Sequence, residues 1–276
     1  YHPDLPNNGV TTELSDLPGS KVVSSTIGIV MLRSYILAGD TAHYDAVIRA
    51  LEAKGMAVIP TFAGGLDARP AIERYLCDDH AAHIDCLISL TGFSLVGGPA
   101  YNDSDAAVSI LSCLDVPYVA AHSLEFQTLG QWAESEGGLG PVETTMLIAL
   151  PEIDGATNPT VFGGRHGLDG CQGCSHMCNS TSAVKEMAPC HERIASLAEK
   201  VKRLSNLRRK ENADKKVGIV LFGFPPNAGA VGTAAYLSVF ESLHNTLKRM
   251  AANGYTLEVP KTVDDLRDIV LKGNSG

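Results

Sequence analysis

Runs of apolar residues alternate with amphipathic segments through the first half of the chain. The runs at 26–32, 56–62, 84–92 and 116–123 predict buried β-strands. Between them, 41–55, 69–79 and 104–115 carry apolar residues at helical spacing, as Val47, Ile48 and Leu51 do. This alternation is typical of a parallel sheet with helices on both faces, so we expect a doubly wound α/β unit over about 20–125.

The pattern changes after this point and then resumes. We predict a helix over 140–150 that Pro151 ends, a strand at 159–165, and a long helix over 191–216. A strand at 216–224, a helix over 232–254, a strand at 255–259 and a helix over 262–273 follow. The fold class is therefore α/β, with two doubly wound, mostly parallel units joined by a loop-rich connector. We expect a first unit at 1–135, a connector at 136–190, and a second unit at 191–276 that belongs to a larger domain of the full protein.

Composition narrows the possible functions. The net charge of −9 argues against a nucleic-acid partner. No apolar run is long enough to span a bilayer, and no signal peptide is visible. Seven cysteines in a chain of 276 residues do not form a secreted disulfide framework, so we expect a cytoplasmic protein. Because the chain starts at Tyr1 rather than Met, we interpret it as an internal fragment.

The segments that follow the predicted strands are rich in glycine and aromatic residues. Gly64, Gly65, Gly97 and Gly98 permit close approach of a ligand to the backbone, although ordinary βα turns also favour glycine. A second glycine-rich stretch, 222–237, leads from a strand into a helix but lacks the lysine of a phosphate-binding loop. The sequence therefore does not predict ATP hydrolysis by this chain.

Longer segments carry a specific resemblance. They are "AGDTAHYDAVIRALEAKGMAVIPTFAGGLDARPAIERYL", "LTGFSLVGGPAYND", "VPYVAAHSLEFQTLGQW", "GPVETTMLIALPEIDGATNPTVFGGR" and "GIVLFGFPPNAGAVGTAAYLSVFESLHNTLKRM". Together they resemble the large (H) subunit of magnesium chelatase, which is related to the N subunit of cobaltochelatase. The cysteine-rich insert is similar to the bacteriochlorophyll branch of that family.

The resemblance implies a function in bacteriochlorophyll or chlorophyll biosynthesis, and so in photosynthesis. The subunit would bind protoporphyrin IX and insert Mg²⁺, while two AAA+ partner subunits of the I and D type bind and hydrolyse ATP. The methyltransferase that acts next on Mg-protoporphyrin is a further partner that the resemblance suggests. Two alternatives stay open: a cobaltochelatase-type subunit that acts on a corrinoid precursor, and a tetrapyrrole carrier or sensor without catalysis.

Metal insertion requires a base and oxygen ligands. Two pyrrole protons must leave the ring, and Mg²⁺ prefers oxygen ligands over thiolates. The candidate carboxylates are Glu125, which follows a buried strand, Glu143, Glu152 and Asp154, and we favour Glu152, then Asp154. Each of them has an alternative role in helix capping or in a surface turn.

The macrocycle also needs an apolar slot with donors for its propionates. Arginines pair well with carboxylates, and histidines can act as bases near neutral pH. Core packing is the alternative role for the aromatic residues. The candidates are Arg33, Tyr35, Phe62, Phe93, His122, Phe126, Trp132, Arg165 and His166.

The segment "GLDGCQGCSHMCN" contains three closely spaced cysteines. Cys171, Cys174 and Cys178, with Cys190 further on, predict an accessory zinc or iron–sulfur site. A redox-sensitive disulfide and free thiols are the alternatives. Because thiolates are poor ligands for Mg²⁺, we do not expect metal insertion at this loop.

Overall fold

The computed structural model describes residues 1–18, 24–78, 81–98, 101–167, 171, 173, 186–221, 232–234 and 237–273. Contacts between residues divide the chain into two compact units, Tyr1–Arg208 and Arg209–Gly276. Each unit is described by itself.

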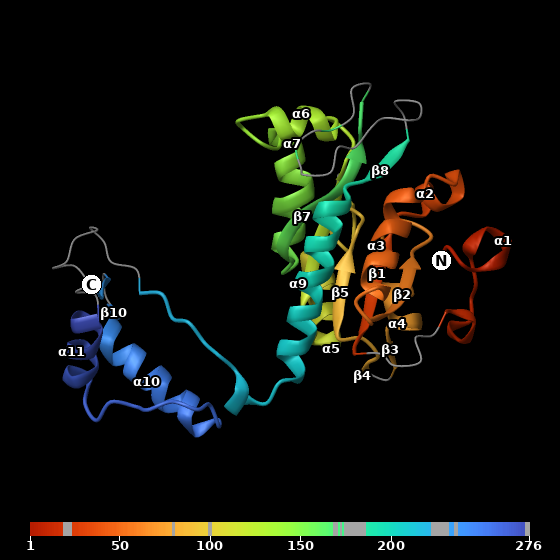
Figure 1. Ribbon diagram of the computed structural model, residues 1–276. Coiled ribbons are helices and arrows are strands. Elements are labelled where there is room, and N and C mark those ends of the chain that lie inside the picture. The colour runs from red at the N-terminus through yellow and green to blue at the C-terminus, as the bar shows by residue number, and fades with distance from the viewer. Residues whose placement is uncertain are drawn as a thin grey trace. The chain divides into compact units, whose positions relative to one another are not determined.

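The first unit is built on a six-stranded sheet (Figure 1). The strand order is β2-β1-β5-β6-β7-β8, and every neighbouring pair is parallel except β7 with β8. The expected α/β fold with a mostly parallel sheet is thus confirmed. The strands are β1 (Thr26–Met31), β2 (Ala57–Phe62), β5 (Cys86–Ser89), β6 (Tyr118–Leu124), β7 (Thr157–Arg165) and β8 (Met187–Pro189).

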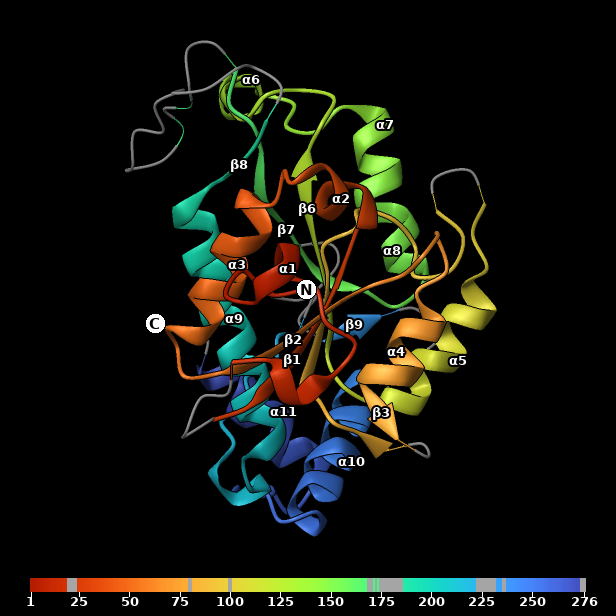
Figure 2. The same cartoon turned by 90° about the vertical axis from the view of Figure 1, so that its right-hand side faces the viewer.

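Helices cover both faces of this sheet. Figure 2 shows α3 (Ala42–Glu52) and α9 (His191–Arg209) on one side, and α4 (Arg69–Tyr75) and α5 (Ser104–Leu114) on the other. Alternate residues of β1 divide between the two cores: Ile27 and Ile29 pack with α3 and α9, whereas Val30 packs with α4 and α5. Burial on both faces explains why the strands are continuous apolar runs.

Shorter elements connect this framework. The two-residue strands β3 and β4 form an antiparallel pair, and β3 replaces the end of the helix predicted to reach residue 79. The other elements are α1 (Pro6–Gly9), the 3₁₀ helix η1 (Leu14–Asp16), α2 (Arg33–Ala38), β3 (Cys77–Asp78), β4 (Ala81–Ala82), α6 (Leu129–Glu134), α7 (Pro141–Glu143), the π-helix η2 (Thr144–Ala149) and α8 (Leu150–Ile153).

The expectation that Pro151 ends a helix is wrong. Helical structure continues from α7 through η2 into α8 and ends at Ile153, with Pro151 buried inside it. A proline ring normally clashes with the carbonyl four residues earlier. The π-helix just before Pro151 widens the backbone turn, which relieves this clash.

The boundary between the units lies later in the chain than the sequence predicts. Strand β7, expected in a connector, pairs with β6 in the main sheet. Helix α9, expected in the second unit, buries Ile194, Leu197 and Val201 in the same core as α3. The first unit therefore extends to Arg208.

The second unit contains η3 (Asn212–Asp214), β9 (Thr233–Ala234), β10 (Leu237–Ser238), α10 (Val239–Ala252) and α11 (Val263–Gly273). The predicted strands at 216–224 and 255–259 do not form within the described residues, where 216–221 and 255–259 pair with no other strand. At the start of α11, Thr262 and Asp265 exchange backbone–side-chain hydrogen bonds of 3.1 Å, which confirms the capping box that this spacing predicts. Within the described part of the chain, no helix combines the length and apolarity that crossing a bilayer requires.

Candidate functional site

The candidate site lies at the carboxyl ends of the parallel strands, where several polar side chains come close together. Numbered in chain order, the five parallel strands lie in the order 2-1-3-4-5 across the sheet. The direction in which successive strands are added to the sheet therefore reverses between β1 and β5. Ligands of such sheets bind beyond the carboxyl ends of the strands near that point. The segments at this edge are α2 after β1, the loop after β5, and Glu125–Gln127 after β6.

Glu125 is fixed at this edge by a residue from another strand connection. The Tyr35 hydroxyl, on α2, donates a hydrogen bond to Glu125 Oε1, and this bond bridges the end of β5. Burial and the Glu125 carboxylate raise the pKa of Tyr35 well above its usual value, while Arg165 opposes this shift. Tyr35 therefore remains a protonated donor at every physiological pH, and Glu125 stays exposed to solvent.

A second carboxylate, Glu143, is bonded to the same loop through Gln127. Gln127 donates through Nε2 to Glu143 Oε2, and the Gly140 amide donates to the same oxygen at 3.1 Å. The Glu143 side chain is only 3% exposed, and its Oε1 has no hydrogen-bond partner among the described residues. Phe126, between Glu125 and Gln127, is 66% exposed. Phe126 therefore presents an exposed apolar ring next to the exposed Glu125, whereas the Glu143 carboxylate is buried.

Aromatic rings support the Tyr35 side of the site. Tyr35 contacts His43 and Tyr44 edge-on, and His43 stacks on Phe162 with centroids 5.8 Å apart. His43 is fully buried, and burial lowers its pKa to about 3. His43 is therefore neutral and acts as part of the core rather than as a base at neutral pH.

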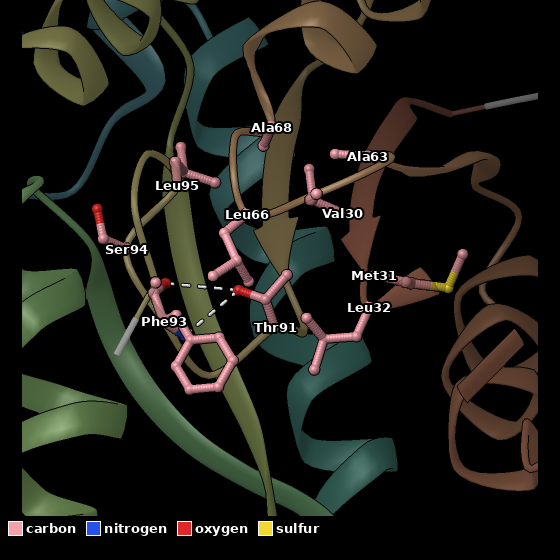
Figure 3. Close-up of a pocket in the computed structure, with 12 residues that line it drawn as sticks. Val30, Met31, Leu32, Ala63, Leu66, Ala68, Thr91, Phe93, Ser94 and Leu95 are labelled. Atoms are coloured by element: carbon pink, nitrogen blue, oxygen red, sulfur yellow. Dashed lines mark hydrogen bonds between the residues drawn. The ribbon is translucent and has the colours of Figure 1, made fainter. Parts of the chain in front are cut away.

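A small pocket lies directly at the reversal point. Figure 3 shows Leu32, Leu66 and Phe93 around Thr91, whose hydroxyl bonds the backbone of Phe93. The space open to a water-sized molecule is about 20 Å³, which is enough for one water molecule but not for a macrocycle. Phe93 therefore lines a closed turn in this conformation rather than an open slot.

The remaining predicted ring contacts are dispersed. Arg33 is exposed and reaches the Gly64 carbonyl at 3.4 Å, whereas Phe62 faces the N-terminal segment. Arg165 and His166 lie at the carboxyl edge of β7, and burial lowers the pKa of His166. His122 and Trp132 line a groove beside β7. The structure therefore gathers Tyr35, Glu125, Phe126 and Arg165 at one edge but not the whole predicted set.

Glu152 and Asp154 lie away from this edge. The α7–α8 helix must run back toward the amino ends of the strands because β7, which follows it, is parallel to β6. The nine residues of β7 lie between Asp154 and the carboxyl edge at Arg165, and the loop after β5 folds back to meet Asp154. Glu152 is exposed, whereas Asp154 is 1% exposed and accepts the Leu95 amide at 3.0 Å. Asp154 thus anchors the loop after β5.

The predicted cysteine site is described only in part. Cys171 and Cys190 are buried in the same apolar cluster as Leu124 and Leu129, while Cys174 and Cys178 lie outside the described residues. Within the described part, no group of three or more His, Cys, Asp or Glu side chains is placed to hold a metal ion. The accessory zinc or iron–sulfur site stays a prediction.

Comparison with known proteins identifies the family. Residues 1–275 match the family described as CobN/Magnesium Chelatase, so the chain belongs to this family. It is 65% identical over 278 residues to the magnesium-chelatase H subunit of Cereibacter sphaeroides, a match that covers 100% of this chain and 23% of the relative. It is 44% identical over 248 residues to the chloroplastic magnesium-chelatase subunit ChlH of Oryza sativa subsp. japonica, covering 89% of this chain and 17% of that protein.

A solved structure supports the fold. The catalytic subunit of cobaltochelatase from Mycobacterium tuberculosis superposes with a TM-score of 0.69 at 24% identity, covering 92% of this chain and 21% of that one. The chain thus spans about a quarter or less of the length of these relatives.

Some contacts of the candidate site could not be predicted from the sequence. The Tyr35–Glu125 bond joins residues 90 positions apart, and no local pattern could predict it. The two basic residues on the wall of the β7 groove, Arg193 and Lys200, carry no signal that separates them from a solvated helix face. Their approach to Trp132 and Thr160 depends on how α9 packs beside the sheet.

Proposed function

We propose that this chain forms part of the ring-binding and metal-insertion region of a magnesium chelatase. In this proposal the subunit holds protoporphyrin IX while Mg²⁺ replaces the two pyrrole protons. AAA+ subunits of the I and D type hydrolyse ATP and drive the cycle in the cytoplasm. The observation that carries the proposal is the family match along the whole chain, together with a tethered, solvent-accessible carboxylate at the carboxyl edge of the sheet.

Glu125 is the proton acceptor in this proposal. Its carboxylate is reachable from solvent, and the Tyr35 bond fixes its orientation, as a general base requires. Phe126 offers an apolar surface beside it for a flat ring, and Arg165 provides a positive charge near the Tyr35–Glu125 pair. Mg²⁺, as the substrate ion, would meet oxygen ligands here rather than sulfur.

The proposed order of the carboxylates differs from the one that the sequence favours. The sequence places Glu152 and Asp154 first, as a turn exposed to the ring. In the structure the Asp154 carboxylate binds a buried backbone amide, and Glu152 lies near the amino end of β7. These positions favour Glu125 as the base and a structural role for Asp154.

Two other functions make different predictions. A cobaltochelatase-type subunit would act on a corrinoid precursor, and a carrier would bind a ring without inserting metal. The identity of 65% to a magnesium-chelatase subunit, against 24% to the cobaltochelatase structure, favours magnesium and protoporphyrin.

The test uses the intact subunit that contains this chain, with its partner subunits, ATP and Mg²⁺. We expect protoporphyrin IX to be converted to Mg-protoporphyrin, measured by its absorbance and fluorescence, and a corrin precursor with Co²⁺ to give no product. Cobalt insertion into the corrin would support the cobaltochelatase alternative. Tight ring binding without insertion of either metal would support the carrier.

A further inference from the structure

A groove runs along the free edge of β7, apart from the Tyr35–Glu125 pair. Strand β8 pairs only with Gly163–Arg165, so the earlier part of β7 has β6 on one side and no strand on the other among the described residues. The groove opens beside Pro159, Thr160 and Val161, and its volume is about 420 Å³. Sites for small organic ligands fall in the range of about 300–1,000 Å³.

The two walls of the groove have opposite character. One wall is apolar and consists of Trp132 from α6, Leu139, and Ile148 from η2. The other wall is the polar side of α9, where Arg193, Ser196 and Lys200 recur at helical spacing. Glu192 is the acidic residue among the described lining residues. The groove is therefore amphipathic across its width, with two cations on one side.

Two contacts hold these side chains in position at the groove. The Arg193 guanidinium lies over the Trp132 ring, 4.2 Å from its centroid, so this cation is held at the mouth of the apolar wall. Lys200 reaches the hydroxyl of Thr160 on the β7 edge at 3.4 Å. Seven residues of helix separate the two cations by about 10 Å along α9.

The floor of the groove contains a buried imidazole. His122 on β6 is 1% exposed, and its Nδ1 has no hydrogen-bond partner among the described residues. Burial lowers the pKa of His122 to about 4, so the ring is neutral at physiological pH. A buried, unpartnered nitrogen is costly unless something satisfies it, which points to a ligand or water here.

We propose that this groove binds the edge of a planar conjugated macrocycle that carries two carboxylates, with Arg193 and Lys200 as its specificity-determining residues. The apolar wall contacts this edge of the ring, and the two cations on α9 pair with carboxylates on its flexible arms. A ring with two carboxylates can contact the apolar wall and pair with the two cations at once, whereas an uncharged ring can contact only the apolar wall. The identity of the ring as a tetrapyrrole rests on the proposed function, but the charge requirement rests on the groove alone.

The test measures ring binding by the intact subunit without Mg²⁺, ATP or partner subunits. The probes are protoporphyrin IX and its dimethyl ester, which keeps the ring and removes both charges. The variants are R193M, K200M and the double variant, which keep an extended apolar side chain and lose the cation. K202M is the matched control because Lys202 lies on the same helix and is not among the described residues that line the groove.

We expect the double variant to bind protoporphyrin at least about tenfold more weakly than wild type, and each single variant to show part of that loss. K202M and wild type should bind equally, and the dimethyl ester should bind all proteins with the same lower affinity. The fluorescence of Trp132 is the difference between the emission of wild type and that of W132F. This emission should be quenched when the ring binds. K200M alone serves if the double variant fails to fold, because Lys200 is not part of the core.

Equal protoporphyrin affinity in wild type and K200M would overturn the inference. So would an equal loss for the acid and its ester, because the cations would then not recognise carboxylates. Weaker ring binding by R193M and K200M, together with full insertion activity of E125Q, would refute the role of Glu125 and leave the groove intact. Loss of insertion in E125Q, with ring binding unaffected by R193M and K200M, would refute the groove and leave the role of Glu125 intact.

Discussion

The Tyr35 hydroxyl donates a hydrogen bond to Glu125, joining the segment after β1 to the segment after β6 across the end of β5. This bond fixes a carboxylate at the edge of the sheet where ligands of such folds bind. Because the Tyr35 pKa is raised by burial and by Glu125, the phenol keeps its proton and the interaction persists over the working pH range.

Removing this hydroxyl should affect chemistry more than folding. We expect Y35F to lower the rate of Mg²⁺ insertion about tenfold, the worth of one hydrogen bond to a charged group. Insertion is measured from initial rates in the reconstituted enzyme, and folding from the thermal midpoint. Y101F is the control because Tyr101 is 67% exposed. Equal rates for Y35F and wild type would show that Glu125 needs no tether.

Asp154 should contribute to stability through the loop after β5. We expect D154A to lower the free energy of unfolding by about 1–3 kcal/mol, since it leaves the buried Leu95 amide without its acceptor. Exposed Glu152 is the matched control, and E152A should change stability by less than about 0.5 kcal/mol. Denaturant unfolding measures both. A D154A protein as stable as E152A would contradict the anchoring role.

The same residue predicts a pH dependence of known sign. Burial raises the pKa of Asp154 above 3.8, so the folded state favours its protonated form. Stability from this group is complete below the unfolded pKa and is lost as pH rises through the folded pKa. The stability of D154N relative to wild type should therefore increase from pH 4 to pH 7. A constant difference across that range would contradict the raised pKa.

His43 should change the pH dependence of stability in the opposite direction from Asp154. Its pKa falls to about 3 in the folded state, and both ring nitrogens lack hydrogen-bond partners among the described residues. The stability from neutral His43 is complete above the unfolded pKa of about 6.5 and is lost as pH falls, by up to about 1.4 kcal/mol per pH unit. We expect H43L to flatten this slope between pH 6.5 and 4.5 in denaturant unfolding. Exposed His83 is the control, and H83Q should keep the wild-type slope.

Glu143 links the site loop to the start of α7. We expect E143A to lower the free energy of unfolding by about 1–2 kcal/mol, because the Gly140 amide and the Gln127 side chain lose their shared acceptor. Exposed Glu134 provides the comparison, and E134A should be close to wild type. Similar unfolding curves for the two variants would argue against this cap.

Much of the first unit could be predicted because buried parallel strands are continuous apolar runs. Ile27 and Ile29 mark β1 regardless of their partners, and each of the four predicted runs overlaps a strand of the sheet. The second unit was harder, because an extended segment becomes a strand only when another strand pairs with it. Residues 216–221 have no such partner among the described residues, and Val220 is 92% exposed despite its apolar side chain.

The site was only partly predictable for a related reason. Glu125 follows a recognisable strand, so its position at the carboxyl edge could be inferred from the sequence. The roles of Glu152 and Asp154 depended on where the helix before β7 ends, and the π-helix carried it past Pro151. Arg193 and Lys200 could not be separated from other basic residues of α9 without knowing which side faces β7.

The central claim is that Glu125 accepts the pyrrole protons, and one comparison tests it most directly. E125Q and E152Q would be introduced into the intact subunit, and Mg²⁺ insertion into protoporphyrin would be measured with saturating partner subunits and ATP. We predict that E125Q loses about 10²–10⁴-fold in rate while still binding the ring, and that E152Q stays close to wild type. Wild-type insertion by E125Q, with activity lost in E152Q instead, would contradict the account.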